Sequence, residues 1–182
     1  MLTAQDYPSG LFCDEAGVDM VLVGDSLGMT TLGYKGTNLV TMREMVHHAK
    51  AVKRGVKRAF LVGDMPFGSY WGEGDALKNA TKFIRSEMNA IKLEGGREVA
   101  GIVKALTKRG IVVMGHIGLT PQKSESFGGF KVFGAKEVNE AMQLWEDAKI
   151  LRDSGASFIV LECVPERLAT LITQNLGIPT IG

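Results

Sequence analysis

The sequence lacks most of the features that mark a specialised class of protein. Only two cysteines are present, Cys13 and Cys163, too few for a disulfide framework and without metal-ligand spacing, so we expect a reducing compartment. The charges nearly balance, with 21 Lys and Arg against 20 Asp and Glu. A formal net charge of +1 gives no general attraction to nucleic acid. We therefore predict no nucleic-acid partner.

Long apolar runs are also missing. No run approaches the roughly 20 residues that span a bilayer, and the opening "MLTAQDYPSG" has neither the basic nor the apolar region of a signal peptide. These absences predict a protein that does not bind membranes and is cytoplasmic. The mitochondrial matrix is the alternative location if the source is eukaryotic and a transit peptide is missing from this chain.

What the sequence does contain is an alternation of short apolar runs with helical patterns. Strands are predicted at Leu2–Ala4, Met20–Val23, Ala59–Val62, Ala90–Leu93, Ile111–Met114, Phe158–Leu161 and Pro179–Ile181. Between them, "TMRE" from Thr41 is a capping box, and Asp75 is expected to cap the next helix. With 45% hydrophobic residues in a chain of 182, this order predicts one globular domain, a parallel sheet covered by helices.

The predicted strands end on ionisable residues. The segments are "VLVGDSLG" (Asp25), "FLVGDMPF" (Asp64), "AIKLEGG" (Lys92 and Glu94), "VVMGHIG" (His116) and "FIVLECVP" (Glu162). An open doubly wound sheet gathers ligand groups at one switch point, whereas a barrel brings residues from many strand ends to one mouth. Five such strands favour the (β/α)8 TIM barrel. Since seven strands are one short of closure, we expect residues 1–182 to form a single barrel domain that is truncated at the C-terminus and lacks its eighth strand.

The same segments resemble a known family. "VGDSLGMTTLGY", "DMPFGSY", "IKLEGG", "GHIGLTPQ" and "LECVP" are similar, in order and spacing, to the signature segments of ketopantoate hydroxymethyltransferases. The resemblance implies a (β/α)8 barrel of the phosphoenolpyruvate/pyruvate superfamily. It also implies a Mg2+-dependent enzyme that transfers a hydroxymethyl group from 5,10-methylenetetrahydrofolate to 3-methyl-2-oxobutanoate, giving 2-dehydropantoate for pantothenate and coenzyme A synthesis. Its partners would be these two substrates and, at full length, copies of itself in a homo-oligomer, a decamer in the resembling family.

The chemistry of this reaction matches the residue types. Removing a proton from the carbon beside a ketone needs a Lewis acid for the developing enolate and a base placed over that carbon. Mg2+ takes oxygen ligands, keeps waters, and uses one or two protein carboxylates, which Asp25 and Asp64 can supply along with contacts to the bound 2-oxo acid. Glu162 is the candidate base.

Further roles concern substrate binding. Lys92 offers a positive charge to the substrate carboxylate or the enolate oxygen, and Ser26 can hydrogen-bond the same acid. The resemblance implies that Glu94 holds metal-bound water as an outer ligand and that His116 lies near the substrate.

Each of these residues also has a purely structural interpretation. Asp25 follows a strand as helix caps often do, and Lys92 with Glu94, two residues apart on one side of a strand, forms a structural ion pair in the alternative reading. His116 would then be a satisfied buried histidine, and Glu162 would form a salt bridge at the rim.

Two other functions stay open at the level of the sequence. One is another Mg2+-dependent, enolate-forming carbon–carbon lyase of the same superfamily. These lyases typically carry a reactive cysteine in a "KKCGH"-like loop, and no such segment occurs here. The other is a non-catalytic truncated remnant, which the intact set of acids argues against.

Overall fold

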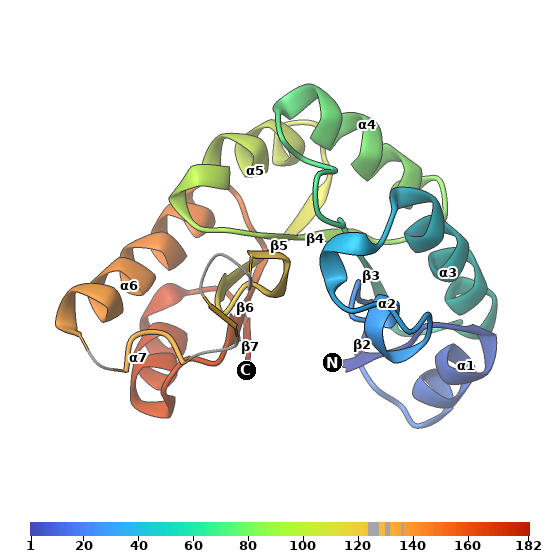
Figure 1. Ribbon diagram of the computed structural model, residues 1–182, viewed down its shortest axis with the longest axis horizontal. Coiled ribbons are helices and arrows are strands. Elements are labelled where there is room, and N and C mark those ends of the chain that lie inside the picture. The colour runs from blue at the N-terminus through green and yellow to red at the C-terminus, as the bar shows by residue number, and fades with distance from the viewer. Residues whose placement is uncertain (124–127, 130–131, 136) are drawn as a thin grey trace. The chain divides into compact units, whose positions relative to one another are not determined.

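The computed structural model describes residues 1–123, 128–129, 132–135 and 137–182, which divide into two compact units, residues 1–92 and 93–182. Strands and helices alternate along the chain (Figure 1). The strands are β1 (Leu2–Thr3), β2 (Met20–Val23), β3 (Phe60–Asp64), β4 (Ala90–Glu94), β5 (Val112–Gly118), β6 (Phe158–Glu162) and β7 (Thr180–Ile181). The helices are α1 (Tyr7–Glu15), α2 (Leu27–Thr30), α3 (Met42–Gly55), α4 (Glu73–Ile84), α5 (Ala100–Thr107), α6 (Val138–Asp153) and α7 (Glu166–Leu176), with short 3-10 turns η1 (Thr37–Leu39) and η2 (Arg97–Val99).

All seven predicted strands form, each within a few residues of its predicted bounds, and their pairings are parallel within each unit. No helix in the described ranges is long and apolar enough to cross a membrane.

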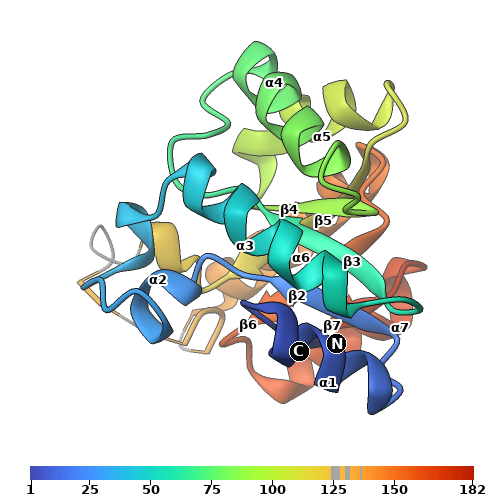
Figure 2. The ribbon, with the colours of Figure 1, turned by 90° about the vertical axis from the view of Figure 1, so that its right-hand side faces the viewer.

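The first unit pairs β1, β2, β3 and β4 in chain order. The register sets Val21 opposite Leu61 and Asp64 opposite Lys92, so the ends of β3 and β4 lie side by side. Helices α1 and α3 pack against each other, as the turned view in Figure 2 shows. The core between β3 and α4 is tight at Gly63, where an added Cβ would lie 2.4 Å from Cδ1 of the fully buried Phe83. Only glycine fits there without displacing that ring.

The second unit pairs β5 with β6 and β6 with β7. Gly118 lies opposite Glu162 in this register, and its φ of +91° together with an added-Cβ distance of 2.2 Å to the Glu162 carbonyl requires glycine. Just past the end of β4, Gly95 forms an isolated antiparallel bridge with His116. These two contacts bring the carboxyl ends of β4, β5 and β6 together within the unit.

Helix α3 begins at the predicted capping box. The Thr41 hydroxyl accepts the N–H of Glu44 at 3.3 Å, and the Glu44 carboxylate accepts the N–H of Thr41 at 2.8 Å. Tyr34, in the loop after α2, donates its phenol O–H to the same carboxylate. That hydrogen bond is the main cause that holds the pKa of Glu44 below its ordinary value and raises the pKa of Tyr34.

The predicted cap at Asp75 is wrong. Helix α4 begins at Glu73 with Gly72 as its N-cap, which makes no side-chain capping bond. Asp75 lies inside the first turn, where two acids face the positive end of the helix dipole. An acid in the first turn of a helix and an acid at its N-cap look alike in a sequence, so the predicted N-cap fell at Asp75 instead of Gly72.

Candidate functional site

Three predicted residues meet in the first unit, and we call Asp25, Asp64 and Lys92 the acid–lysine cluster. The Lys92 ammonium lies 2.6 Å from Oδ1 of Asp64, and both side chains are almost fully buried, at 5% and 2% exposure. The backbone N–H of Asp25 donates to Oδ2 of Asp64 at 3.2 Å. Asp25 itself is buried. The register of β3 and β4 positions this cluster, because it sets Asp64 and Lys92 directly opposite each other.

Ser26 follows the cluster on the surface. It occupies the cap position of α2, but its side chain makes no capping bond, and the residue is exposed. The N-cap position of α2 thus belongs to Ser26 and not to Asp25. An added Cβ on Gly24 would lie 3.3 Å from the Ser26 hydroxyl and 3.8 Å from Oδ2 of Asp64, so a larger residue at this position would contact both oxygens.

The other three predicted residues meet in the second unit, and we call Glu94, His116 and Glu162 the histidine cluster. The two nitrogens of the buried His116 ring face opposite acids: Nε2 lies 3.1 Å from Oε2 of Glu162, and Nδ1 lies 3.6 Å from Oε1 of Glu94. Glu94 is 1% exposed and accepts the backbone N–H of Gln122 at 3.1 Å. The Glu162 side chain is 38% exposed, so it is the member of this cluster that a ligand can reach.

Long-range contacts that the sequence does not reveal hold the loop after β4. Asp147 on α6 accepts Nε of Arg97 at 2.7 Å, and an added Cβ on Gly96 would lie 2.5 Å from its carboxylate. Glu98 accepts the N–H of Gly96 at 3.1 Å and pairs with Lys123 at 2.8 Å. Burial alone would raise the pKa of Glu98, but the hydrogen bond from Lys123 with its positive charge and the backbone N–H of Gly96 together hold it below its ordinary value.

The structure thus brings the predicted residues together in two groups, one in each unit. The purely structural interpretations of Lys92 and His116 can be compared with these contacts. Lys92 forms an ion pair with Asp64, a partner that the sequence interpretation did not name, and His116 is buried between two acids. Gln122 was missed because it acts through its backbone N–H, which no side-chain pattern marks. Asp147 was missed because its partner Arg97 lies 50 residues away in the sequence.

Metal binding was predicted at Asp25 and Asp64. Within the described ranges no group of three or more His, Cys, Asp or Glu side chains is arranged to hold a metal ion. The oxygen donors of the acid–lysine cluster are two buried carboxylates, which is the number that Mg2+ commonly takes from a protein when substrate and water complete its shell. The kind and number of these donors are those that Mg2+ takes, and in this structure the two Asp64 oxygens are bound by Lys92 and by the N–H of Asp25.

Comparison with solved structures shows the class of fold. The chain matches oxaloacetate acetylhydrolase in complex with oxalate at a TM-score of 0.73 and 18% identity, over 98% of this chain and 64% of that chain. It matches phosphonopyruvate hydrolase complexed with oxalate and Mg++ at 0.73 and 12%, with the same coverage. It also matches 2,3-dimethylmalate lyase, a PEP mutase/isocitrate lyase superfamily member, at 0.70 and 17%, again over 98% and 64%. At these identities the likeness shows the fold alone, and it confirms the α/β, barrel-type fold class predicted from the sequence.

Sequence comparison then identifies the family. The profile of the ketopantoate hydroxymethyltransferases matches residues 1–182. The chain is 54% identical to the 3-methyl-2-oxobutanoate hydroxymethyltransferase of Ignicoccus hospitalis, over all of this chain and 69% of the relative, and 56% identical to that of Carboxydothermus hydrogenoformans, over all of this chain and 66% of the relative. The chain belongs to the ketopantoate hydroxymethyltransferase family, as its motifs predicted, and spans about two thirds of the length of these relatives.

Proposed function

We propose that the chain carries the keto-acid chemistry of a 3-methyl-2-oxobutanoate hydroxymethyltransferase. In the overall reaction, the one-carbon unit of 5,10-methylenetetrahydrofolate forms a bond to C3 of 3-methyl-2-oxobutanoate. The C3 proton leaves to a base, the bonds from the one-carbon unit to folate nitrogen break, and one water supplies the hydroxyl oxygen. The products are 2-dehydropantoate and tetrahydrofolate.

One observation supports this proposal most directly: the contrast in exposure within the histidine cluster. Glu94 and His116 are 1% and 2% exposed, whereas Glu162 is 38% exposed with its carboxylate 3.1 Å from the His116 ring. A base must reach the substrate and be oriented by groups behind it. Glu162 is exposed enough to reach a substrate, and the buried His116 ring behind it, with Glu94 on the far side of that ring, would orient it.

The acid–lysine cluster supplies the charged groups that would bind a 2-oxo acid and its metal ion. Asp25 and Asp64 would hold Mg2+, and phosphonopyruvate hydrolase, which shares this fold, was solved with Mg++ and oxalate. Bound Mg2+ would act as a Lewis acid that lowers the cost of removing the C3 proton. Lys92 would bind the substrate carboxylate or the enolate oxygen, and the exposed Ser26 hydroxyl would donate a hydrogen bond to the same acid.

Proton removal can be tested without the folate. We expect Glu162→Gln to abolish solvent deuterium exchange at C3 of 3-methyl-2-oxobutanoate in the presence of Mg2+, while binding of the keto acid stays within about twofold, because the glutamine keeps the shape but cannot accept the proton. Glu166→Gln, the same change on an exposed residue at the start of α7, is the matched control. Normal exchange in Glu162→Gln would refute the assignment of the base.

Product analysis separates the transferase from the alternative lyase. Exchange of the C3 proton shows that an enolate of the keto acid forms, but it does not show transfer of a one-carbon unit. Only the transferase gives 2-dehydropantoate when 5,10-methylenetetrahydrofolate is added. A cytoplasmic location and assembly of the full-length protein into a homo-oligomer belong to the same proposal, and size-exclusion chromatography with light scattering measures the assembly.

A further inference from the structure

The loop that follows α2 is tied to α3 by the side chain of Tyr34. Its phenol O–H donates to Oε1 of Glu44, in the first turn of α3. The other carboxylate oxygen of Glu44 accepts the N–H of Thr41 at 2.8 Å and its hydroxyl at 2.7 Å, which fixes the orientation of the carboxylate. The pKa of Glu44 is held below its ordinary value and that of Tyr34 above it, mainly by the bond between them, so this charge-assisted hydrogen bond persists through the neutral range.

Tyr34 also holds the turn that carries Asp25. The backbone N–H of Tyr34 donates to the carbonyl of Gly28 in α2 at 2.7 Å, and the N–H of Gly28 donates in turn to the carbonyl of Asp25 at 3.0 Å. An added Cβ on Gly28 would lie 3.3 Å from Cδ2 of Tyr34, so the ring lies against this glycine. Tyr34 therefore contacts the turn through both its backbone and its ring.

These hydrogen bonds form one chain that ends at the acid–lysine cluster. The N–H of Asp25 donates to Oδ2 of Asp64 at 3.2 Å, and the Lys92 ammonium lies 2.6 Å from Oδ1 of the same residue. Every bond of the chain, from Glu44 through Tyr34 to Asp64, lies within the first unit. Because Asp25 and Asp64 are both buried, a shift of the turn moves their carboxylates within closely packed surroundings.

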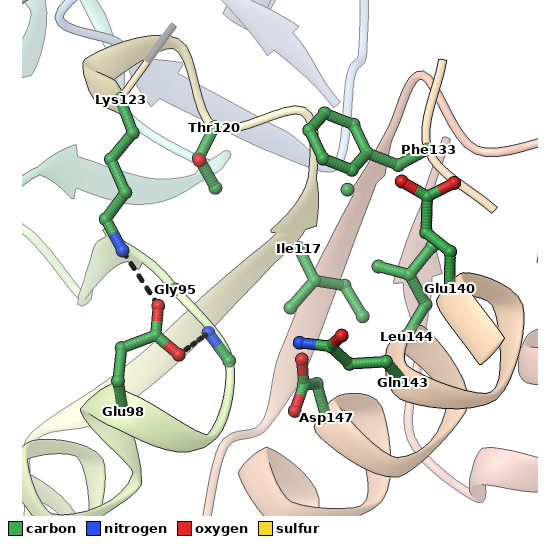
Figure 3. A pocket seen from close by; sticks show the side chains of 12 residues that line it. Gly95, Glu98, Ile117, Thr120, Lys123, Phe133, Glu140, Gln143, Leu144 and Asp147 are labelled. Carbon is green, nitrogen blue, oxygen red and sulfur yellow. Dashed lines mark hydrogen bonds and ion pairs between the residues drawn. The ribbon is translucent and has the colours of Figure 1, made fainter. Parts of the chain in front are cut away.

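A carboxylate joins two loops in the second unit as well. Glu98 accepts the N–H of Gly96 and pairs with Lys123 at the wall of a cavity of about 280 Å3 (Figure 3). That bridge connects the loop after β4 with the loop after β5. The bridge at Glu44 differs from it, because hydrogen bonds continue from Glu44 to both predicted metal ligands. Its effect should therefore be measurable at those ligands.

We infer that Tyr34 and Glu44 are positioning residues for Asp25 and for Ser26 beside it. This inference rests on the proposed function, which assigns binding of Mg2+ and the keto acid to this turn. Tyr34 holds one end of the turn through Gly28, while Asp64 accepts the N–H of Asp25.

The role predicts which step of the reaction suffers. Mg2+ demands a nearly ideal arrangement of its oxygen ligands, so a turn that is no longer tied to α3 offers the binding geometry for a smaller fraction of the time. The candidate base, Glu162, belongs to the second unit. Loss of the phenol should therefore weaken binding of the metal and the keto acid and leave proton removal from the bound keto acid nearly unchanged.

Amide hydrogen exchange tests the positioning without any ligand. Tyr34→Phe removes the phenol O–H and keeps the ring that lies against Gly28. On the whole 182-residue chain, followed by NMR, we expect this change to speed exchange of the Gly28 and Asp25 N–H groups about fivefold or more. Tyr7→Phe, the same change on an exposed tyrosine of α1, is the control and should leave both rates within about twofold. Unchanged rates in Tyr34→Phe would overturn the inference.

Calorimetric titration with Mg2+, in the presence of 3-methyl-2-oxobutanoate, measures the effect at the metal ligands. We expect Tyr34→Phe and Glu44→Ala each to weaken Mg2+ binding by about fivefold or more. The double variant should bind no more weakly than Glu44→Ala alone, because both changes remove the same hydrogen bond.

Ser9→Ala is the control for lost stability in this titration. It removes the capping box at the start of α1, in the same unit, and should leave Mg2+ affinity within about twofold. Losses that multiply in the double variant, or a Ser9→Ala variant that binds Mg2+ as weakly as Tyr34→Phe, would show a general loss of stability and refute the positioning role.

Deuterium exchange at C3 of the keto acid separates this inference from the proposed function. In Tyr34→Phe we expect KM for the keto acid to rise severalfold, while kcat for exchange changes by less than about twofold. A lower kcat with an unchanged KM would contradict the inference. If exchange is absent from the unsubstituted chain, the proposed function is wrong, and amide hydrogen exchange still decides whether Tyr34 holds the turn.

Discussion

Replacing Lys92 by methionine is the sharpest test of the acid–lysine cluster. The substitution keeps the length and apolar stem of the side chain but removes the ammonium that lies 2.6 Å from Asp64. Asp64 would then be a carboxylate at 2% exposure that has lost its cation. Removing one partner of a buried ion pair costs about 3–5 kcal/mol, because the other charge stays buried without compensation.

The structure places the expected cost at the lower end of this range. Asp64 keeps the backbone N–H of Asp25 at 3.2 Å, which continues to stabilise its negative charge. We therefore expect Lys92→Met to lower the free energy of unfolding by about 3 kcal/mol, or about a hundredfold in the folding equilibrium.

Urea unfolding followed by circular dichroism measures the loss. Lys104→Met, the same change at an exposed position of α5, is the control and should stay within about 0.5 kcal/mol of the unsubstituted chain. The double substitution of Lys92 by methionine and Asp64 by asparagine should be less destabilised than Lys92→Met alone, because position 64 then carries no charge that has lost its partner. Equal stability of Lys92→Met and Lys104→Met would refute the reasoning, as would a double variant whose losses add.

Magnesium provides an independent check on the same variant. If Asp25 and Asp64 bind Mg2+, the ion replaces the lost positive charge, and millimolar Mg2+ should raise the unfolding midpoint of Lys92→Met more than that of the unsubstituted chain. An unchanged midpoint in Lys92→Met would contradict the assignment of the metal ligands.

The remaining predictions concern stability at two other positions. The pKa of Glu98 is lower in the folded chain than its ordinary value, so its contribution to stability is complete above that ordinary value and is lost as the pH falls through the lowered one. Glu98→Gln should therefore lower the free energy of unfolding at pH 7 by less than about 1 kcal/mol, since the Glu98–Lys123 pair is half exposed. In acid unfolding curves, this difference from the unsubstituted chain should disappear at pH values below the lowered pKa of Glu98. Gly63→Ala should lower the free energy of unfolding by about 1–3 kcal/mol, because the new methyl group meets the buried Phe83 ring. Gly74→Ala, in open space on α4, is the control and should stabilise the chain slightly. Thermal unfolding of the two variants measures both effects.

The sequence predicted the strands and the residues at their ends because those signals are local. Each strand is a short apolar run, and each of the predicted residues Asp25, Asp64, Glu94 and Glu162 stands where such a run stops. The capping box at Thr41 is equally local, since both of its partners lie within four positions.

Contacts between residues far apart in the sequence could not be predicted in the same way. The partner of Lys92 is Asp64, 28 residues earlier, because the register of β3 and β4 sets the two opposite each other, and neither strand alone encodes that register. Asp147 looks like any acid on a helix until the fold brings Gly96 and Arg97 against it. Such pairs depend on the assembled fold.

The carboxylate of Glu44 joins two local structures that would otherwise vary separately. It accepts the N–H of Thr41, which starts α3, and the phenol O–H of Tyr34, which anchors the loop after α2. Positions 34, 41 and 44 should therefore change together during evolution. A relative without an acid at 44 would have little reason to keep a phenol at 34, and transplanting the loop from one homologue to another should succeed only when the first turn of the helix is transplanted with it.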